Sequence, residues 1–151
     1  MKYLLPSLFI LLFFNACSYK NAYSSFDMNK TSELVESNTL SSKIESKNGV
    51  IGLISVTYLN NIYKTDFKNE EVFLISLYMK DKQTEYSLKL NHELALKTTK
   101  VTENDKFFNL LINKNSWNDN YLISFKKSGV DLNLSLEVEN SSSLMFKYLK
   151  E

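Results

Sequence analysis

The sequence contains no arginine, and it has one cysteine, one histidine, one tryptophan, one proline and three glycines among 151 residues. All eighteen residues counted as lysine or arginine are lysines, and seventeen acidic residues leave a net charge of +1. Arginine makes the bidentate contacts by which proteins recognise phosphate and guanine, and a nearly neutral chain does not attract a polyanion. We therefore expect no nucleic-acid partner. A single cysteine also excludes an internal disulfide and a multi-cysteine metal site.

Residues suited to catalysis are scarce as well. His92 stands beside Glu93 in a predicted turn, without a second metal ligand or a neighbouring nucleophile. The carboxylates of Glu70 and Glu71 precede a predicted strand, where we expect them to keep its end solvated rather than to act as an acid–base pair. The three glycines form no phosphate-binding loop. These observations predict a protein that is not an enzyme and has no cofactor or metal; a hidden active site is the less favoured alternative.

The N-terminus has the pattern of an export signal. Lys2 is followed by an apolar run over residues 3–14, which a proline and a serine interrupt. This run is shorter than the roughly 20 residues that a membrane-spanning helix needs, and it matches the apolar region of a secretory signal peptide. Directly after it, the small residue Ala16 precedes Cys17, the only cysteine.

This Ala16-Cys17 pair resembles the lipobox of bacterial lipoproteins, with Phe14 at a position where that family usually has Leu. The resemblance implies that residues 1–16 are a lipoprotein signal peptide, that the Cys17 thiol receives a diacylglycerol, and that the new amino group is acylated. Two or three acyl chains give durable membrane attachment. Ser18 follows the cysteine, and a residue other than Asp there implies the outer membrane in enterobacterial lipoproteins. The expected location is the cell envelope, at the outer membrane, with the membrane as a partner.

Residues 17–48 are rich in Ser, Asn, Lys, Thr and Glu, so we interpret them as the lipidated Cys17 followed mostly by a polar tether, part of which could fold onto the domain. A short helix from Leu34 to Ser37, capped by Ser32, is predicted within this segment.

Two asparagines fit the acidic-x-Asn-x-Ser/Thr sequon of bacterial oligosaccharyltransferases. Asn29 lies in the tether, where such an enzyme could reach it, and is the candidate glycosylation site. Asn133 lies in the middle of a predicted strand, where access is expected to be poor.

From residue 49 onward, apolar residues recur with a period of two, which is typical of β-strands. In the clearest case, Val130 to Val138, one face is apolar and the other polar. The segment from Glu71 to Met79 is apolar on both faces, which predicts a central strand. Eight strands are expected: Val50–Leu59, Glu71–Met79, Tyr86–Leu90, Leu94–Val101, Phe107–Ile112, Tyr121–Lys126, Val130–Val138 and Leu144–Leu149.

Short strands at near-regular spacing predict an all-β domain over residues 49–151, a β-sandwich or a small barrel. Phe107–Ile112 is apolar all round and fits a short helix as an alternative. The pair Ser128-Gly129 separates two alternating segments and predicts a tight hairpin turn.

The layout of lipobox, polar tether and cysteine-free strand domain resembles small lipoproteins with a variant immunoglobulin fold from low-GC Gram-negative bacteria. The abundance of Lys and Asn without Arg suits an AT-rich genome. The resemblance implies an immunoglobulin-like β-sandwich of about seven or eight strands and an envelope location, with no known enzymatic role. It identifies no binding residues.

Trp117 lies in the most polar loop of the predicted domain, residues 113–120. An exposed aromatic ring among polar neighbours favours glycan or protein partners, although the indole could instead fold back over one end of the sandwich. We expect a lipid-anchored protein that binds an unknown protein or glycan, in adhesion or as an envelope accessory. The alternative is a periplasm-facing inhibitor of a lytic enzyme.

Overall fold

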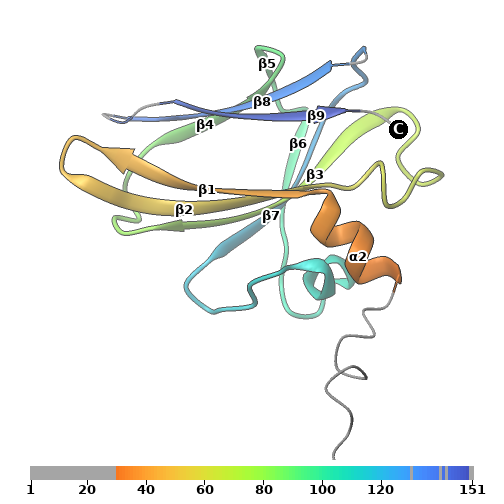
Figure 1. The fold of residues 1–151 in the computed structure, drawn as a ribbon, viewed down its shortest axis with the longest axis horizontal. Helices are drawn as coiled ribbons and strands as arrows, with labels where there is room; N and C mark the ends of the chain where they lie inside the picture. The colour runs from red at the N-terminus through yellow and green to blue at the C-terminus, as the bar shows by residue number, and fades with distance from the viewer. Residues whose placement is uncertain (1–29, 130, 140, 142, 150–151) are drawn as a thin grey trace, which may run out of the picture.

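Figure 1 shows the fold in a computed structural model that describes residues 30–129, 131–139, 141 and 143–149. The predicted signal peptide, Cys17 and Asn29 lie outside the described residues. The described residues form one α-helix, one 3-10 helix and nine strands, with these bounds: α2 Lys30–Ser37, β1 Thr39–Ser46, β2 Gly49–Tyr58, β3 Glu70–Met79, β4 Tyr86–Leu90, β5 Glu93–Leu94, β6 Lys97–Lys100, η2 Lys106–Leu110, β7 Asp119–Lys126, β8 Asp131–Val138 and β9 Leu144–Leu149.

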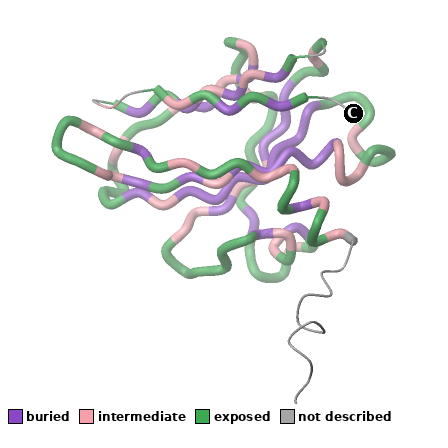
Figure 2. The backbone as a smooth tube through the Cα atoms, viewed as in Figure 1, coloured by how far each residue is buried: buried purple, intermediate pink, exposed green. Residues whose placement is uncertain are grey.

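The strands form two antiparallel sheets that face each other (Figure 1). The larger sheet has the order β1-β2-β3-β7-β6, and the smaller has the order β5-β4-β8-β9. Both contribute apolar side chains to one core between them, and buried residues recur along the strands of both sheets (Figure 2). The prediction of an all-β fold built as a sandwich is therefore confirmed, with nine described strands instead of seven or eight.

Strands β3 and β8 show how the sequence pattern sets the position of a strand. Along β8, Leu132, Leu134 and Leu136 point into the core, while the residues between them are half-buried. Strand β3 is buried along both faces and lies in the middle of the larger sheet, as its apolar sequence predicts.

The core between the sheets contains a cluster of aromatic rings from three strands of the larger sheet and one of the smaller. Phe73 packs against Tyr58, Phe125 and Tyr148 with ring centroids 5.1 to 5.9 Å apart. The Tyr148 hydroxyl on β9 donates a hydrogen bond of 2.7 Å to the carbonyl oxygen of Val56 on β2. The two sheets are thus joined by apolar burial and by a buried hydrogen bond between them.

A second apolar cluster lies on the outer face of the larger sheet, beneath the connection from β6 to β7. Phe107 and Leu111 of this connection pack with Val72 and Leu74 of β3. The strand predicted over Phe107–Ile112 is wrong, and the helical alternative is correct, because residues 106–110 form the 3-10 helix η2. Asp105 caps η2 by accepting a hydrogen bond of 3.0 Å from the Phe107 amide.

The folded domain begins earlier than residue 49. Strand β1 pairs with β2 along its whole length, and helix α2 precedes it. The predicted short helix is present but starts at Lys30, so Ser32 lies within it and does not cap it. The tether interpretation fails for residues 30–46 because β1 directs only Ile44 fully into the core, which leaves its apolar pattern too weak to recognise.

Two predicted connections differ from the structure. Ser128-Gly129 is not a hairpin turn, because β7 lies in the larger sheet and β8 in the smaller, so this link crosses between sheets. The strand predicted over Leu94–Val101 is divided into β5 and β6, which also belong to different sheets. Both errors have one cause. An alternating pattern identifies a strand that buries one face, but it does not tell to which sheet that strand belongs.

Gly52 provides a test of the close packing between β1 and β3. A Cβ atom at this position would lie 2.6 Å from the Tyr78 carbonyl oxygen and 2.7 Å from the Met79 sulfur. Since the carbonyl cannot move without disturbing the ladder, we expect Gly52→Ala to lower the free energy of unfolding by about 1–3 kcal/mol in urea titrations.

Gly129→Ala is the matched control, because nothing lies within 4 Å of its Cβ position. It should leave the stability almost unchanged. Equal stability of the Gly52→Ala and Gly129→Ala variants would contradict the close packing assigned to Gly52.

Candidate functional site

Trp117 is the most exposed aromatic side chain among the described residues, with 71% of its surface accessible. It lies between η2 and β7, in the connection that covers part of the outer face of the larger sheet (Figure 1). The indole therefore does not fold back over the end of the sandwich.

The backbone around Trp117 is held in place even though the indole is exposed. The side-chain oxygen of Asn115 accepts hydrogen bonds from the amides of Trp117, at 3.1 Å, and Asn118, at 3.0 Å. The Asn118 side-chain amide donates to the Ser76 hydroxyl on β3 over 2.8 Å. The Lys82 ammonium donates to the Trp117 carbonyl oxygen over 3.2 Å. These bonds fix the loop to the sheet, as a preformed binding site requires.

Two lysines beside the loop are paired with one carboxylate. The Asp119 carboxylate, at the start of β7, accepts hydrogen bonds from Lys82 at 2.9 Å and Lys100 at 3.0 Å. The bonds from Lys82 and then Lys100 hold the pKa of Asp119 below its ordinary value. Asp119 therefore stays ionised at neutral pH and keeps both lysines oriented toward the base of the loop.

A groove of about 340 Å³ lies between this loop and the outer face of β2 and β3. We call it the Trp117 groove, and its lining residues are the following: Leu53, Ser55, Ser76, Tyr78, Asn113, Asn115, Trp117 and Asn118. A neighbouring depression of about 620 Å³ shares Leu53, Ser55 and Asn113 with the groove and continues across β1. The volume of the groove lies at the lower end of the range found for small-molecule sites.

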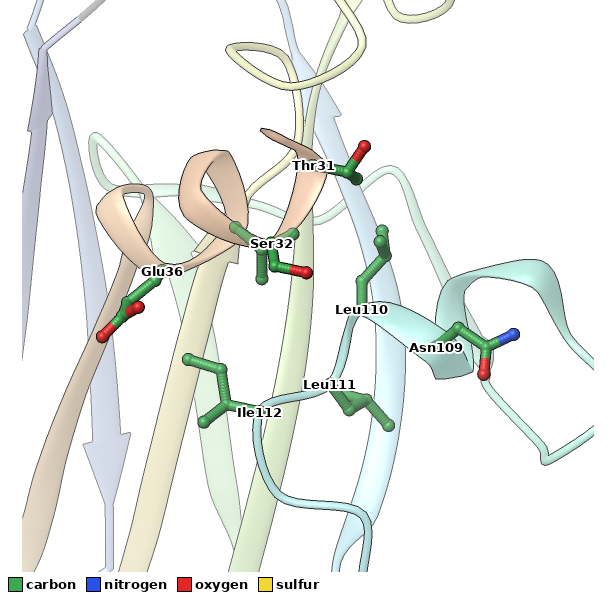
Figure 3. A pocket seen from close by; sticks show the side chains of 8 residues that line it. Thr31, Ser32, Glu36, Asn109, Leu110, Leu111 and Ile112 are labelled. Atoms are coloured by element: carbon green, nitrogen blue, oxygen red, sulfur yellow. The ribbon is translucent and has the colours of Figure 1, made fainter. Parts of the chain in front are cut away.

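Another cavity, of about 500 Å³, lies between α2 and the segment that contains η2. Figure 3 shows Thr31, Ser32 and Glu36 of the helix on one side of this cavity and Asn109 to Ile112 on the other. Four aliphatic and four polar side chains line it, and none is aromatic. It offers fewer directional groups than the Trp117 groove.

The structure also places the other residues that the sequence singled out. His92 is exposed in the two-residue turn between β4 and β5, where it and Asn91 have positive φ angles of 71° and 50°. This confirms the turn predicted for His92. Asn133 lies on β8, paired with Lys147 of β9, and its amide donates to the Asn91 side chain over 2.9 Å. Its backbone is thus fixed on both sides.

No group of three His, Cys, Asp or Glu side chains suited to a metal ion occurs in the described part of the chain. In the same part, no helix has the length and apolar character needed to cross a membrane.

Glu71 is buried, so the prediction that its carboxylate keeps the strand end solvated is wrong. Its side chain has 0% exposure, whereas Glu70 is exposed, so only Glu70 keeps the strand end solvated. The Tyr58 hydroxyl donates to one Glu71 oxygen over 2.6 Å, and the Ser128 amide donates to the other over 3.1 Å. The Lys127 ammonium lies 3.6 Å from the latter oxygen. Because side chains alternate along β3, Glu71 points inward on the same face as Phe73. This spacing in the sequence could have predicted that Glu71 is buried.

Comparisons of the chain with protein-family models, with curated proteins and with solved structures gave no match. The assignment of a site therefore depends on the geometry described above.

The buried tyrosines predict a loss of stability in alkali. Burial is the main cause that raises the pKa of Tyr58 and of Tyr148 above the ordinary value, and Glu71 raises that of Tyr58 further. The unfolded chain releases these protons near pH 10, so the stability is full below that pH and falls above it. We expect the free energy of unfolding to fall by about 1 kcal/mol per pH unit for each of the two residues.

Urea titrations between neutral pH and alkali would measure this slope. In the Tyr148→Phe variant, the fall of the unfolding free energy with pH should be smaller by the contribution of one tyrosine, because the other titrating groups are unchanged. A slope identical to that of the wild type would show that Tyr148 ionises equally in the folded and unfolded states.

Proposed function

We propose that this protein is a non-enzymatic bacterial lipoprotein that is anchored to the outer membrane through Cys17 and binds a protein or glycan partner through the Trp117 groove. The lipid anchor is supported by the export signal and the Ala16-Cys17 pair of the sequence. The binding role is supported above all by one observation: a firmly held loop presents an exposed indole over a groove.

We further propose that the sandwich is immunoglobulin-like. The strand order β2-β3-β7-β6 is the order A-B-E-D of an immunoglobulin domain, and β5-β4-β8-β9 corresponds to C′-C-F-G. Strand β1 then extends the first sheet beyond strand A. The cysteine pair of antibody domains has no equivalent, and the Glu71 carboxylate instead binds the link between the strands equivalent to E and F. Domains of this type often bind through loops that a rigid sandwich positions.

The anchor predicts the fate of a Cys17→Ala variant. This variant should fail to incorporate radiolabelled palmitate and should accumulate as an unprocessed or soluble form, because the acylated thiol is missing. Labelling in the native host followed by cell fractionation measures both effects. Ser18→Ala is the control and should be labelled like the wild type. Labelling that persists in Cys17→Ala would disprove the anchor assignment.

The binding role predicts a crosslink from the groove in living cells. A photoreactive residue in place of Asn113 should form an adduct with a cell-envelope partner, since Asn113 is exposed and lines the groove. The same residue in place of Leu94, which is 68% exposed and lies on β5 of the other sheet, is the matched control. Equal adducts at both positions, or none at position 113, would contradict binding at the groove. Protease accessibility on intact and permeabilised cells then assigns the partner to the surface or the periplasm.

A further inference from the structure

We infer that the ligand of the Trp117 groove is an uncharged oligosaccharide. This inference rests on the proposed binding function and specifies the chemical class of the partner. It depends on three properties of the groove: its exposed ring, its neutral polar groups and its continuation along the sheet.

The indole of Trp117 supplies the apolar platform that a sugar ring requires. Sugar rings have a face of C–H groups that packs on an aromatic surface, and hydroxyl groups around the edge that need hydrogen bonds. The loop backbone is already fixed by Asn115 and Lys82, so little backbone entropy is lost when a ring stacks on the indole.

Neutral hydrogen-bonding groups surround this platform. The lining of the groove contains serine hydroxyls, asparagine amides and the Tyr78 hydroxyl, and none of its side chains is charged. Within the described residues, neither the Asn113 amide nor the Tyr78 hydroxyl has a hydrogen-bond partner. These groups are therefore available to sugar hydroxyls, which both donate and accept. Of the lysines beside the groove, Lys82 is paired with Asp119 and Lys114 donates to Asn109, so the lining itself offers no cation to compensate the charge of an anionic ligand.

The floor of the groove is polar as well. Ser55 of β2 and Ser76 of β3, which are paired across the two strands, contribute hydroxyl groups to it. The groove continues past Leu53 and Asn113 into the depression across β1, whose lining adds Lys43 and Glu45, two opposite charges that leave the extended surface without net charge. This continuity favours a chain of several sugar units over a single one.

The single tryptophan of the sequence makes the test direct, because all indole emission comes from position 117. The full chain is purified in a detergent without a sugar headgroup and is titrated with short cello-, malto-, manno- and N-acetylchito-oligosaccharides. A saturable change in indole emission with at least one neutral series is expected. Heparin fragments and sialylated oligosaccharides serve as the charged comparison and should cause no saturable change.

Calorimetry then compares variants with the neutral sugar that binds best. Trp117→Ala should weaken binding roughly 30-fold, the loss typical of a central aromatic anchor. Asn113→Ala should weaken it about 5-fold, as expected for one neutral hydrogen bond. Leu94→Ala, which removes a comparably exposed side chain from β5, should bind like the wild type.

Three results would overturn this inference: no response to any neutral oligosaccharide, a response to the charged series alone, or equal affinity of Trp117→Ala and the wild type. A crosslink from position 113 in cells without neutral sugar binding would leave the proposed binding function intact and show that the ligand class is wrong. Absence of both the crosslink and sugar binding would reject the two together.

Discussion

The two sheets of this domain share one apolar core, and strands β2, β3, β4, β7, β8 and β9 direct alternate residues into it. Burial of these side chains between the sheets is the main stabilising contribution in a domain without disulfides. A shift of one residue in the register of β8 would turn Leu132, Leu134 and Leu136 to solvent. The same constraint explains Gly52, which lies opposite Ile44 where the β1–β2 register shifts and where only a residue without a side chain fits.

At one end of this core, Glu71 determines how the chain passes from one sheet to the other. A fully buried carboxylate is costly unless hydrogen bonds replace its hydration. The Tyr58 hydroxyl and the Ser128 amide provide those bonds, so β2, β3 and the link from β7 to β8 meet at a single side chain. The hydrogen bonds that offset the cost of burying the carboxylate therefore also hold this link in one position.

The candidate site lies on the opposite face of the larger sheet from the core, in a segment with little regular structure. The connection from β6 to β7 is attached at Phe107, which packs into the outer cluster, and again at Asn118, which binds Ser76. Between these attachments the chain leaves Trp117 in solvent. A rigid scaffold with an exposed ring on a fixed loop is the usual arrangement by which β-sandwiches bind partners.

The sequence by itself determined the fold class and the central strand, because the period of two follows directly from the geometry of a strand with one buried face. It also identified Trp117 as a candidate and its loop as polar. The tertiary structure alone decided which strands share a sheet, and therefore that Ser128-Gly129 crosses between sheets and that β1 belongs to the domain. It also decided that Glu71 is buried and that the indole remains exposed over a groove. These properties depend on contacts between residues far apart in the chain, such as Asn118 with Ser76, and no local pattern records such contacts.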